Sequence, residues 1–169
     1  MVLRSDAQRN LERVLDAATE VFAASGPDVS VHQIAERAGV GHATVFRRFP
    51  TKDDLMLAVI ERRVEEIRSI FEEELNADDP GEAFFRAMHR VADLHLSATG
   101  LLECVDRCGG KPGGVELESL GRKLVARAQK AGTLRGDVKP EQVQTLVKSV
   151  MQSNPENVGV VLDGLRARS

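Results

Sequence analysis

The chain has 169 residues, of which 42% are hydrophobic and 29% charged, a balance typical of a folded protein rather than a disordered one. No stretch approaches the roughly 18 consecutive apolar residues of a transmembrane helix, and the charged N-terminus lacks the apolar region of a signal peptide. We therefore expect a cytoplasmic protein with no membrane contact. The net charge of −3 excludes DNA binding through bulk positive charge, so any DNA affinity must come from a local arrangement of cations.

Apolar residues recur with the 3.6-residue period of a helix along most of the chain, and no strand pattern stands out. The sequence therefore predicts an all-α fold of about nine helices. The first helix ends at 26–27, where Gly precedes Pro. Ser30 and Gln33 have capping-box spacing and open the second helix, which stops at Gly39. A third helix runs from about 42 to 49.

Six further helices are predicted after Pro50. Thr51 caps the fourth, which ends at 76–80 and has an apolar stripe formed by Leu57, Ile60, Val64, Ile67 and Phe71. The fifth begins at Pro80 and is apolar on more than one side, which predicts a central position. A short sixth helix at about 100–108 leads to a glycine-rich loop at 109–114. The last three helices are amphipathic. The seventh ends near Gly132, the eighth begins after Pro140 and the ninth follows Pro155.

Helices two and three are short and flank the tight turn "GVG" at 39–41, which is the signature of a helix-turn-helix. In that motif the second helix enters the DNA major groove and the first braces it against the backbone. Val45, Phe46 and Phe49 are predicted to cluster toward the core. The polar residues of helix three are left on the other side, and these are His42, Ala43, Thr44, Arg47 and Arg48.

The stretch "VSVHQIAERAGVGHATVFRRFPTKDDLMLAVI" is similar to the N-terminal helix-turn-helix of the TetR/AcrR family of transcriptional regulators. The turn "AGV", the threonine, aromatic and phenylalanine of helix three, and the "K-x-x-L" that opens helix four all keep the family's spacing. The similarity covers about residues 9–60, and the rest of the chain agrees in layout. It implies a three-helix DNA-binding domain at 1–51 and a helical ligand-binding and dimerisation domain at 52–169.

The resemblance also implies which positions contact DNA. Base-reading positions fall on His32, His42 and Ala43, phosphate-contacting positions fall on Thr44, Arg47, Arg48 and Lys52, and Gln33 suits either role. The family usually has tyrosine where this chain has Phe46. A hydroxyl contact is therefore missing, although the ring can still touch a thymine methyl group.

The resemblance further implies a homodimer that binds a palindromic operator in double-stranded DNA and is released by an unknown small-molecule effector. It favours a repressor over an activator. The predicted dimer seam is Val158, Val161, Leu162 and Leu165, and the alternative for these residues is the monomer's own core. Candidate ligand contacts lie on apolar faces and carry soft or polar atoms, with plain core packing as their alternative: Phe71, Phe84, Met88, His95, Cys104 and Met151.

Two other classes of protein compete with this interpretation. An enzyme finds no support, because His89, His95, Asp106 and the two cysteines form no recognised motif and "GGKPGG" lacks the Lys-Ser/Thr of a phosphate-binding loop. No cofactor or metal is implied. Cys104 and Cys108 are expected to be reduced thiols, and a redox or metal-sensing role is the alternative for them. A helical protein that keeps the helix-turn-helix shape but binds a protein partner instead of DNA remains open. The equal numbers of basic and acidic residues within 1–53 favour it, whereas the phosphate positions oppose it.

Overall fold

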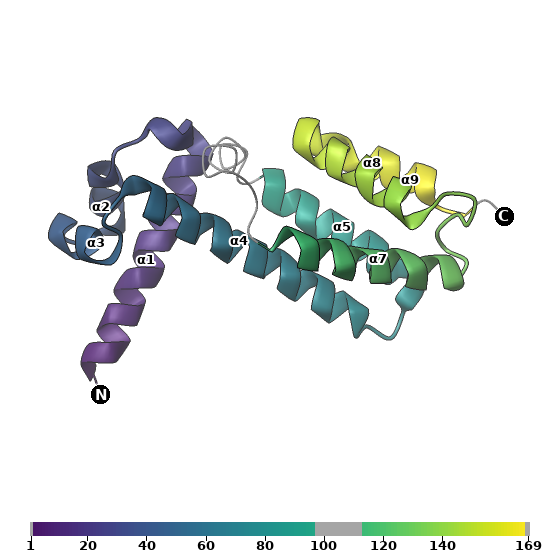
Figure 1. Ribbon diagram of the computed structural model, residues 1–169, viewed down its shortest axis with the longest axis horizontal. Helices are drawn as coiled ribbons and strands as arrows, with labels where there is room; N and C mark the ends of the chain where they lie inside the picture. Colours follow the sequence, from purple (N-terminus) through teal and green to yellow (C-terminus); the bar gives the residue numbers. More distant parts are fainter. Residues whose placement is uncertain (1, 97–112, 168–169) are drawn as a thin grey trace. The chain divides into compact units, whose positions relative to one another are not determined.

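The computed structural model describes residues 2–96 and 113–167. Within these ranges the chain forms eight α-helices and no strand, which confirms the predicted all-α fold (Figure 1). The helices are α1 (Val2–Ser25), α2 (Val31–Ala38), α3 (His42–Arg48), α4 (Lys52–Leu75), α5 (Pro80–Leu96), α7 (Gly114–Lys130), α8 (Pro140–Ser153) and α9 (Val158–Leu165), with 3₁₀ turns at Gly26–Asp28 and Pro155–Asn157. The predicted short helix at about 100–108 lies outside the described residues.

The chain groups into two compact units, and the division falls inside α4, between Arg63 and Val64. The first unit contains α1, α2, α3 and the first half of α4. The second contains the rest of α4 together with α5, α7, α8 and α9. The domain boundary expected from the sequence lies at 51/52, where α4 starts. For the residues that the structure describes, the expected domains and the observed units therefore differ only in which of the two contains residues 52–63.

The first unit is held by a core that α1, α2, α3 and α4 share. α1 ends where Gly26 adopts a φ of 68°, a conformation that favours glycine. The next residue, Pro27, has no N–H to continue a helix. Large core side chains of this unit, each at most 7% exposed, include Phe22, Ile34, Val45, Phe49, Leu55, Met56, Val59 and Ile60.

α4 buries most of the predicted stripe but exposes its first residue. Ile60 and Phe71 are buried, and Ile67 packs against the core of the second unit. Leu57 is instead 39% exposed, and the buried residues near it are Leu55, Met56 and Val59. The expected stripe assumed that one face of α4 meets one core along its whole length. The first half of α4 instead belongs to the first unit, and the face that it turns inward there is set by α1, α2 and α3.

α5 is the central helix of the second unit, as predicted. Its buried residues include Phe84, Phe85, Met88 and Val91, so it is covered on more than one side. Figure 1 shows α5 and α7 next to each other, with α8 and α9 on one side of them and the second half of α4 on the other. One continuous hydrophobic core joins α4, α5, α7, α8 and α9.

Ion pairs hold α5 at its middle and at its start. The carboxylate of Glu74 on α4 is buried and accepts hydrogen bonds from Arg86 Nε at 2.9 Å and Arg90 Nη1 at 3.4 Å. At the start of α5, both carboxylate oxygens of Glu82 accept hydrogen bonds from Arg166, at 2.7 and 2.9 Å. These bonds lower the pKa of Glu82, and they hold the chain after α9 against α5.

Candidate nucleic-acid interface

The turn between α2 and α3 is fixed by caps at both ends of α2. Ser30 Oγ accepts a hydrogen bond from Gln33 N at 3.2 Å, and Ser30 N donates to Gln33 Oε1 at 3.0 Å, so the predicted capping box is present. At the other end Gly39 adopts φ 62° and ψ 35°, which costs an L-residue about 1–2 kcal/mol. The N–H of Val40 then donates to Ala35 O at 3.1 Å. These bonds give the turn one defined shape.

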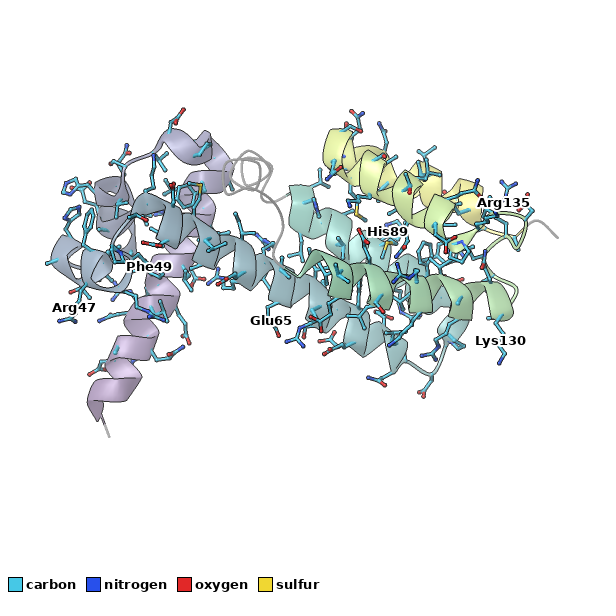
Figure 2. The ribbon with its side chains drawn as sticks, in the orientation of Figure 1. Arg47, Phe49, Glu65, His89, Lys130 and Arg135 are labelled. Atoms are coloured by element: carbon cyan, nitrogen blue, oxygen red, sulfur yellow. The ribbon has the colours of Figure 1, made fainter. Side chains whose placement is uncertain are left out.

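α3 is anchored by two side chains and exposes the others. Val45 and Phe49 are 1% and 7% exposed, and Figure 2 shows Phe49 on the inner side of the unit while Arg47 projects outward. The expectation that Phe46 also faces the core is wrong, because 39% of its surface is exposed. With seven residues, α3 has room for two inward positions one turn apart, and Phe46 lies about 100° around the helix from Val45.

The predicted DNA-facing residues of α3 are therefore all on the surface. His42, Ala43, Thr44, Arg47 and Arg48 are exposed together with His32 and Gln33 on α2, and Lys52 is half-buried in the first turn of α4. Thr51 caps α4, because its Oγ1 accepts from Asp54 N at 3.1 Å. That cap starts α4 directly before Lys52.

Positive charge is left unopposed at α3 although residues 1–53 are neutral as a whole. Among the residues that the structure describes, Arg47, Arg48 and Lys52 form no ion pair. Three other arginines of this unit are each tied to a carboxylate, in the pairs Arg9–Asp6, Arg37–Glu20 at 2.7 Å and Arg62–Asp16 at 2.8 Å. The acidic residues thus neutralise cations elsewhere and leave those at α3 available to an anion.

Three rings form a row on the surface of α2 and α3. The ring centroids of His32 and His42 are 5.3 Å apart, and those of His42 and Phe46 are 4.6 Å apart. Glu36 joins this row, since its Oε1 lies 3.2 Å from His32 Nε2. Sequence reasoning missed Glu36, although its spacing of four residues from His32 on a helix was the signal that pointed to it.

Gln33 has less freedom than the sequence indicated. Its Oε1 already accepts hydrogen bonds from Ser30 N and Ser30 Oγ, at 3.0 and 3.1 Å. The side-chain NH₂ group remains as the donor, so a phosphate or a base acceptor is the contact that this residue can offer without breaking the cap.

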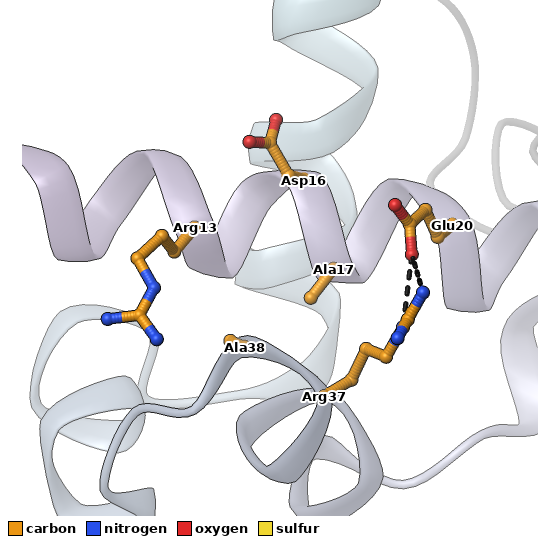
Figure 3. A pocket seen from close by; sticks show the side chains of 6 residues that line it. All are labelled: Arg13, Asp16, Ala17, Glu20, Arg37 and Ala38. Carbon is orange, nitrogen blue, oxygen red and sulfur yellow. Dashed lines mark hydrogen bonds and ion pairs between the residues drawn. The ribbon is translucent and has the colours of Figure 1, made fainter.

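A polar groove of about 310 Å³ lies between α1 and the end of α2 (Figure 3). Arg13 crosses it and donates from Nη2 to Gly39 O at 3.4 Å, while the Arg37–Glu20 ion pair closes the other end. Four of the six lining residues are charged. The polar contacts of these residues hold the turn against α1. The charged lining does not suit an apolar effector. The contact of Arg13 joins residues 26 positions apart, so no local pattern could reveal it.

The predicted ligand contacts lie within the second unit. Four of them are buried in its hydrophobic core, and these are Phe71, Phe84, Met88 and Met151. His95 is half-buried, and its Nδ1 lies 3.0 Å from Val91 O. Cys104, like Cys108, lies outside the described residues. Among the described residues, no group of three or more His, Cys, Asp or Glu could hold a metal ion.

The predicted dimer seam is largely turned inward. Val158, Leu162 and Leu165 are at most 4% exposed within the chain's own core, and Val161 packs against that core. Because so little of their surface is accessible, these side chains offer small area to a second subunit. The exposed apolar residues of α8 and α9 are instead Leu146, at 45%, and Val160, at 74%.

The geometry described above is that of a helix-turn-helix DNA-binding unit attached to a helical bundle. Family comparisons agree with it. Residues 14–59 match the model "Bacterial regulatory proteins, tetR family", and residues 79–167, more than half of the chain, match "Transcriptional regulator SbtR-like, C-terminal domain". In the described residues, no helix has the length and apolarity needed to cross a membrane.

One solved structure matches nearly the whole chain, and curated relatives match about half of it. The crystal structure of a TetR transcription regulatory protein from Mycobacterium vanbaalenii is 40% identical, with a TM-score of 0.78, and the match covers 98% of this chain and 99% of that one. The HTH-type transcriptional regulator TtgW of Pseudomonas putida is 35% identical over 85 residues, or 50% of this chain. An HTH-type transcriptional repressor of Mycobacterium tuberculosis is 41% identical over 78 residues, or 46% of this chain. The aligned parts span 63% and 39% of the lengths of these two curated relatives.

The protein is a transcriptional regulator with a helix-turn-helix DNA-binding domain. The chain belongs to the TetR family. The family consists of transcriptional regulators, so the prediction that the chain is not an enzyme is confirmed.

Proposed function

We propose that the protein is a repressor that binds a palindromic operator as a homodimer and leaves it when a small molecule binds the second unit. The observation that carries the DNA contacts is the placement of charge. Arg47, Arg48 and Lys52 have no carboxylate partner among the described residues, whereas Arg37 and Arg62 in the same unit are paired. The named function of one relative, a transcriptional repressor, supports repression over activation. Such a protein would act in the cytoplasm, where bacterial DNA lies.

In this proposal residues 1–51 read DNA and residues 52–169 sense the effector and dimerise. α3 enters the major groove with His42 and Ala43 toward the bases, while Thr44, Arg47, Arg48 and Lys52 contact phosphates. His32 reaches a base from the start of α2, and Gln33 donates from its NH₂ group. Phe46 contributes its exposed ring to a thymine methyl group.

DNA binding is tested with the purified full-length protein and the DNA upstream of its own gene. Specific, salt-sensitive binding to that DNA, and repression of a reporter placed behind it, would support the proposal. If neither that DNA nor a random duplex pool yields a specific site, the helix-turn-helix serves a protein partner instead and the proposal is wrong.

The homodimer is proposed to form through the outward side of α8 and α9. Val160 is 74% exposed and Leu146 is 45% exposed, and an exposed apolar surface of this kind is stabilised by a second copy. The buried residues Val158, Leu162 and Leu165 support that surface from behind, and Val161 lies at its edge.

Sedimentation of a Val160→Asp variant tests this interface. We expect the variant to sediment as a monomer and to lose operator affinity, because a carboxylate at the interface would have to be buried without a partner. Val115→Asp is the matched control, since Val115 is a valine on α7 with 83% exposure. A dimeric Val160→Asp protein would contradict the proposed interface.

The effector is proposed to enter the core of the second unit. Met88 and Met151 are unbranched and can rearrange to admit a ligand, and Phe71 and Phe84 add apolar surface. His95, which is half-buried, would add a polar contact, and Cys104 is a further candidate from the sequence. An apolar compound that releases the operator should lose potency against Met151→Leu, which keeps the volume of the side chain but removes its flexibility. Equal potency on both proteins would place the effector elsewhere.

A further inference from the structure

Glu36 is an unexpected neighbour for a base-reading histidine, because a carboxylate repels the phosphate backbone. It lies one helical turn after His32 on α2, with Oε1 at 3.2 Å from His32 Nε2. Their side chains are 68% and 65% exposed, so the pair adds little to stability. In a DNA-reading protein Glu36 would therefore weaken general DNA affinity without a compensating gain in stability, which directs attention to its effect on His32.

A carboxylate beside an imidazole influences which nitrogen carries the hydrogen. The negative charge of Glu36 Oε1 lies 3.2 Å from His32 Nε2, so a neutral His32 ring is more stable with its hydrogen on Nε2 than with a lone pair facing the carboxylate. Nδ1 then carries a lone pair and is an acceptor. Among the described residues Nδ1 has no hydrogen-bond partner, and the other neighbour of the ring is His42, whose plane is inclined at 67°.

The ring of His32 is thus held from two sides. The charge of Glu36 favours one tautomer, and the edge-to-face contact with His42 limits how far the ring can tilt. His42 is itself backed by Phe46, at 4.6 Å between ring centroids. A side chain that is held in this way can discriminate between bases better than a freely rotating imidazole.

We propose that Glu36 is a specificity-determining residue that positions His32 as a hydrogen-bond acceptor in the major groove. This inference rests on the proposed DNA-reading function. The chemical class that an acceptor recognises there is an exocyclic amino group, which adenine presents as N6 and cytosine as N4. Guanine and thymine present acceptors at the corresponding edge, so His32 would disfavour them.

A substitution that removes the charge of Glu36 but keeps the size of its side chain tests this role. In a Glu36→Gln variant the amide can donate or accept, so both tautomers of His32 pair with it equally well. His32 Nδ1–H can then donate to guanine or thymine. We expect a preference of about five-fold for adenine or cytosine at one position of each half-site, the selectivity of a single hydrogen bond, to fall to less than about two-fold.

The experiment selects bound sequences from a random duplex pool at pH 8, above the range in which imidazole groups usually titrate. Full-length wild type, Glu36→Gln, His32→Ala and the double variant are compared. The position that loses its preference in His32→Ala is the one that His32 reads. Glu36→Gln should lose preference there, and it should add nothing in the His32→Ala background.

Glu12→Gln serves as the matched charge control. Glu12 is an exposed carboxylate on α1 that pairs with Gln8, and it has no histidine partner in the described part of the chain. Both Gln variants should bind DNA more tightly in general, since each removes a negative charge, but only Glu36→Gln should change the base preference. Three results would overturn this inference but leave the proposed function standing. They are an unchanged base preference in Glu36→Gln, a change that also occurs in the His32→Ala background, and wild-type selection of guanine or thymine at that position. Failure of the wild type to enrich any sequence would instead overturn the proposed function, and the inference with it.

Discussion

The charge arrangement at α3 makes a quantitative prediction for an Arg47→Ala/Arg48→Ala variant. Both guanidinium groups are exposed and without a carboxylate partner among the described residues, so removing them disturbs no ion pair of the fold. Each phosphate that the protein no longer neutralises lowers the slope of log affinity against log salt by about 0.9. Two phosphates per protomer, or four per dimer, then lower it by about 3.6. Over a fourfold rise in salt, from about 50 to 200 mM, the wild type should therefore lose about 150-fold more affinity than the variant.

Fluorescence anisotropy of labelled operator and of unrelated duplex, at several salt concentrations, measures this slope. Both DNAs should be affected alike, because phosphate contacts carry no sequence information. Lys123→Ala/Lys130→Ala removes the same charge from the exposed surface of α7 in the other unit and should leave the slope nearly unchanged. An unchanged slope in the arginine variant, or an altered base preference with undiminished general affinity, would refute the assignment of these residues to phosphate.

Three further predictions concern stability, each measured by unfolding of the full chain. Phe49→Ala removes a side chain that is only 7% exposed and should destabilise the first unit by about 3–5 kcal/mol. Phe46→Ala is the control and should cost far less, because Phe46 is 39% exposed. Equal losses of stability would contradict the assigned packing. Gly39→Ala forces φ 62° on an L-residue and should cost about 1–2 kcal/mol in urea unfolding, so a neutral result would mean that the turn adopts another shape. Because the hydrogen bonds from Arg166 lower the pKa of Glu82 below 4.5, wild type should be more stable than Glu82→Gln above pH 4.5. That advantage should fade as the pH falls through the lowered pKa, and a gap that does not shrink as the pH falls would exclude the carboxylate as its cause.

Local patterns specified the helices and their ends because the information lies within a few residues. Ser30 with Gln33, and Thr51 ahead of α4, form caps that depend on neighbours three positions apart. Gly39 ends α2 because a positive φ is needed there, whatever else packs nearby. The helix-turn-helix and the central position of α5 were predictable for the same reason, since both follow from periodicity and spacing.

Tertiary packing decided which face of each helix is covered. Leu57 lies on an apolar stripe of α4 yet is exposed, because the first half of that helix joins a different unit from the second half. Phe46 points outward because a seven-residue helix is anchored by Val45 and Phe49 alone. The stripe of Val158, Leu162 and Leu165 was expected to meet a partner and instead fills the chain's own core.

Function divides along the same line. The sequence by itself determined that a helix-turn-helix is present and which cations accompany it, because both are properties of neighbouring residues. Only the tertiary structure decided which of those cations lack a partner, since ion pairs such as Arg37–Glu20 and Arg62–Asp16 join residues 17 and 46 positions apart. A neutral stretch of sequence becomes a locally positive surface when its carboxylates are committed elsewhere in the fold.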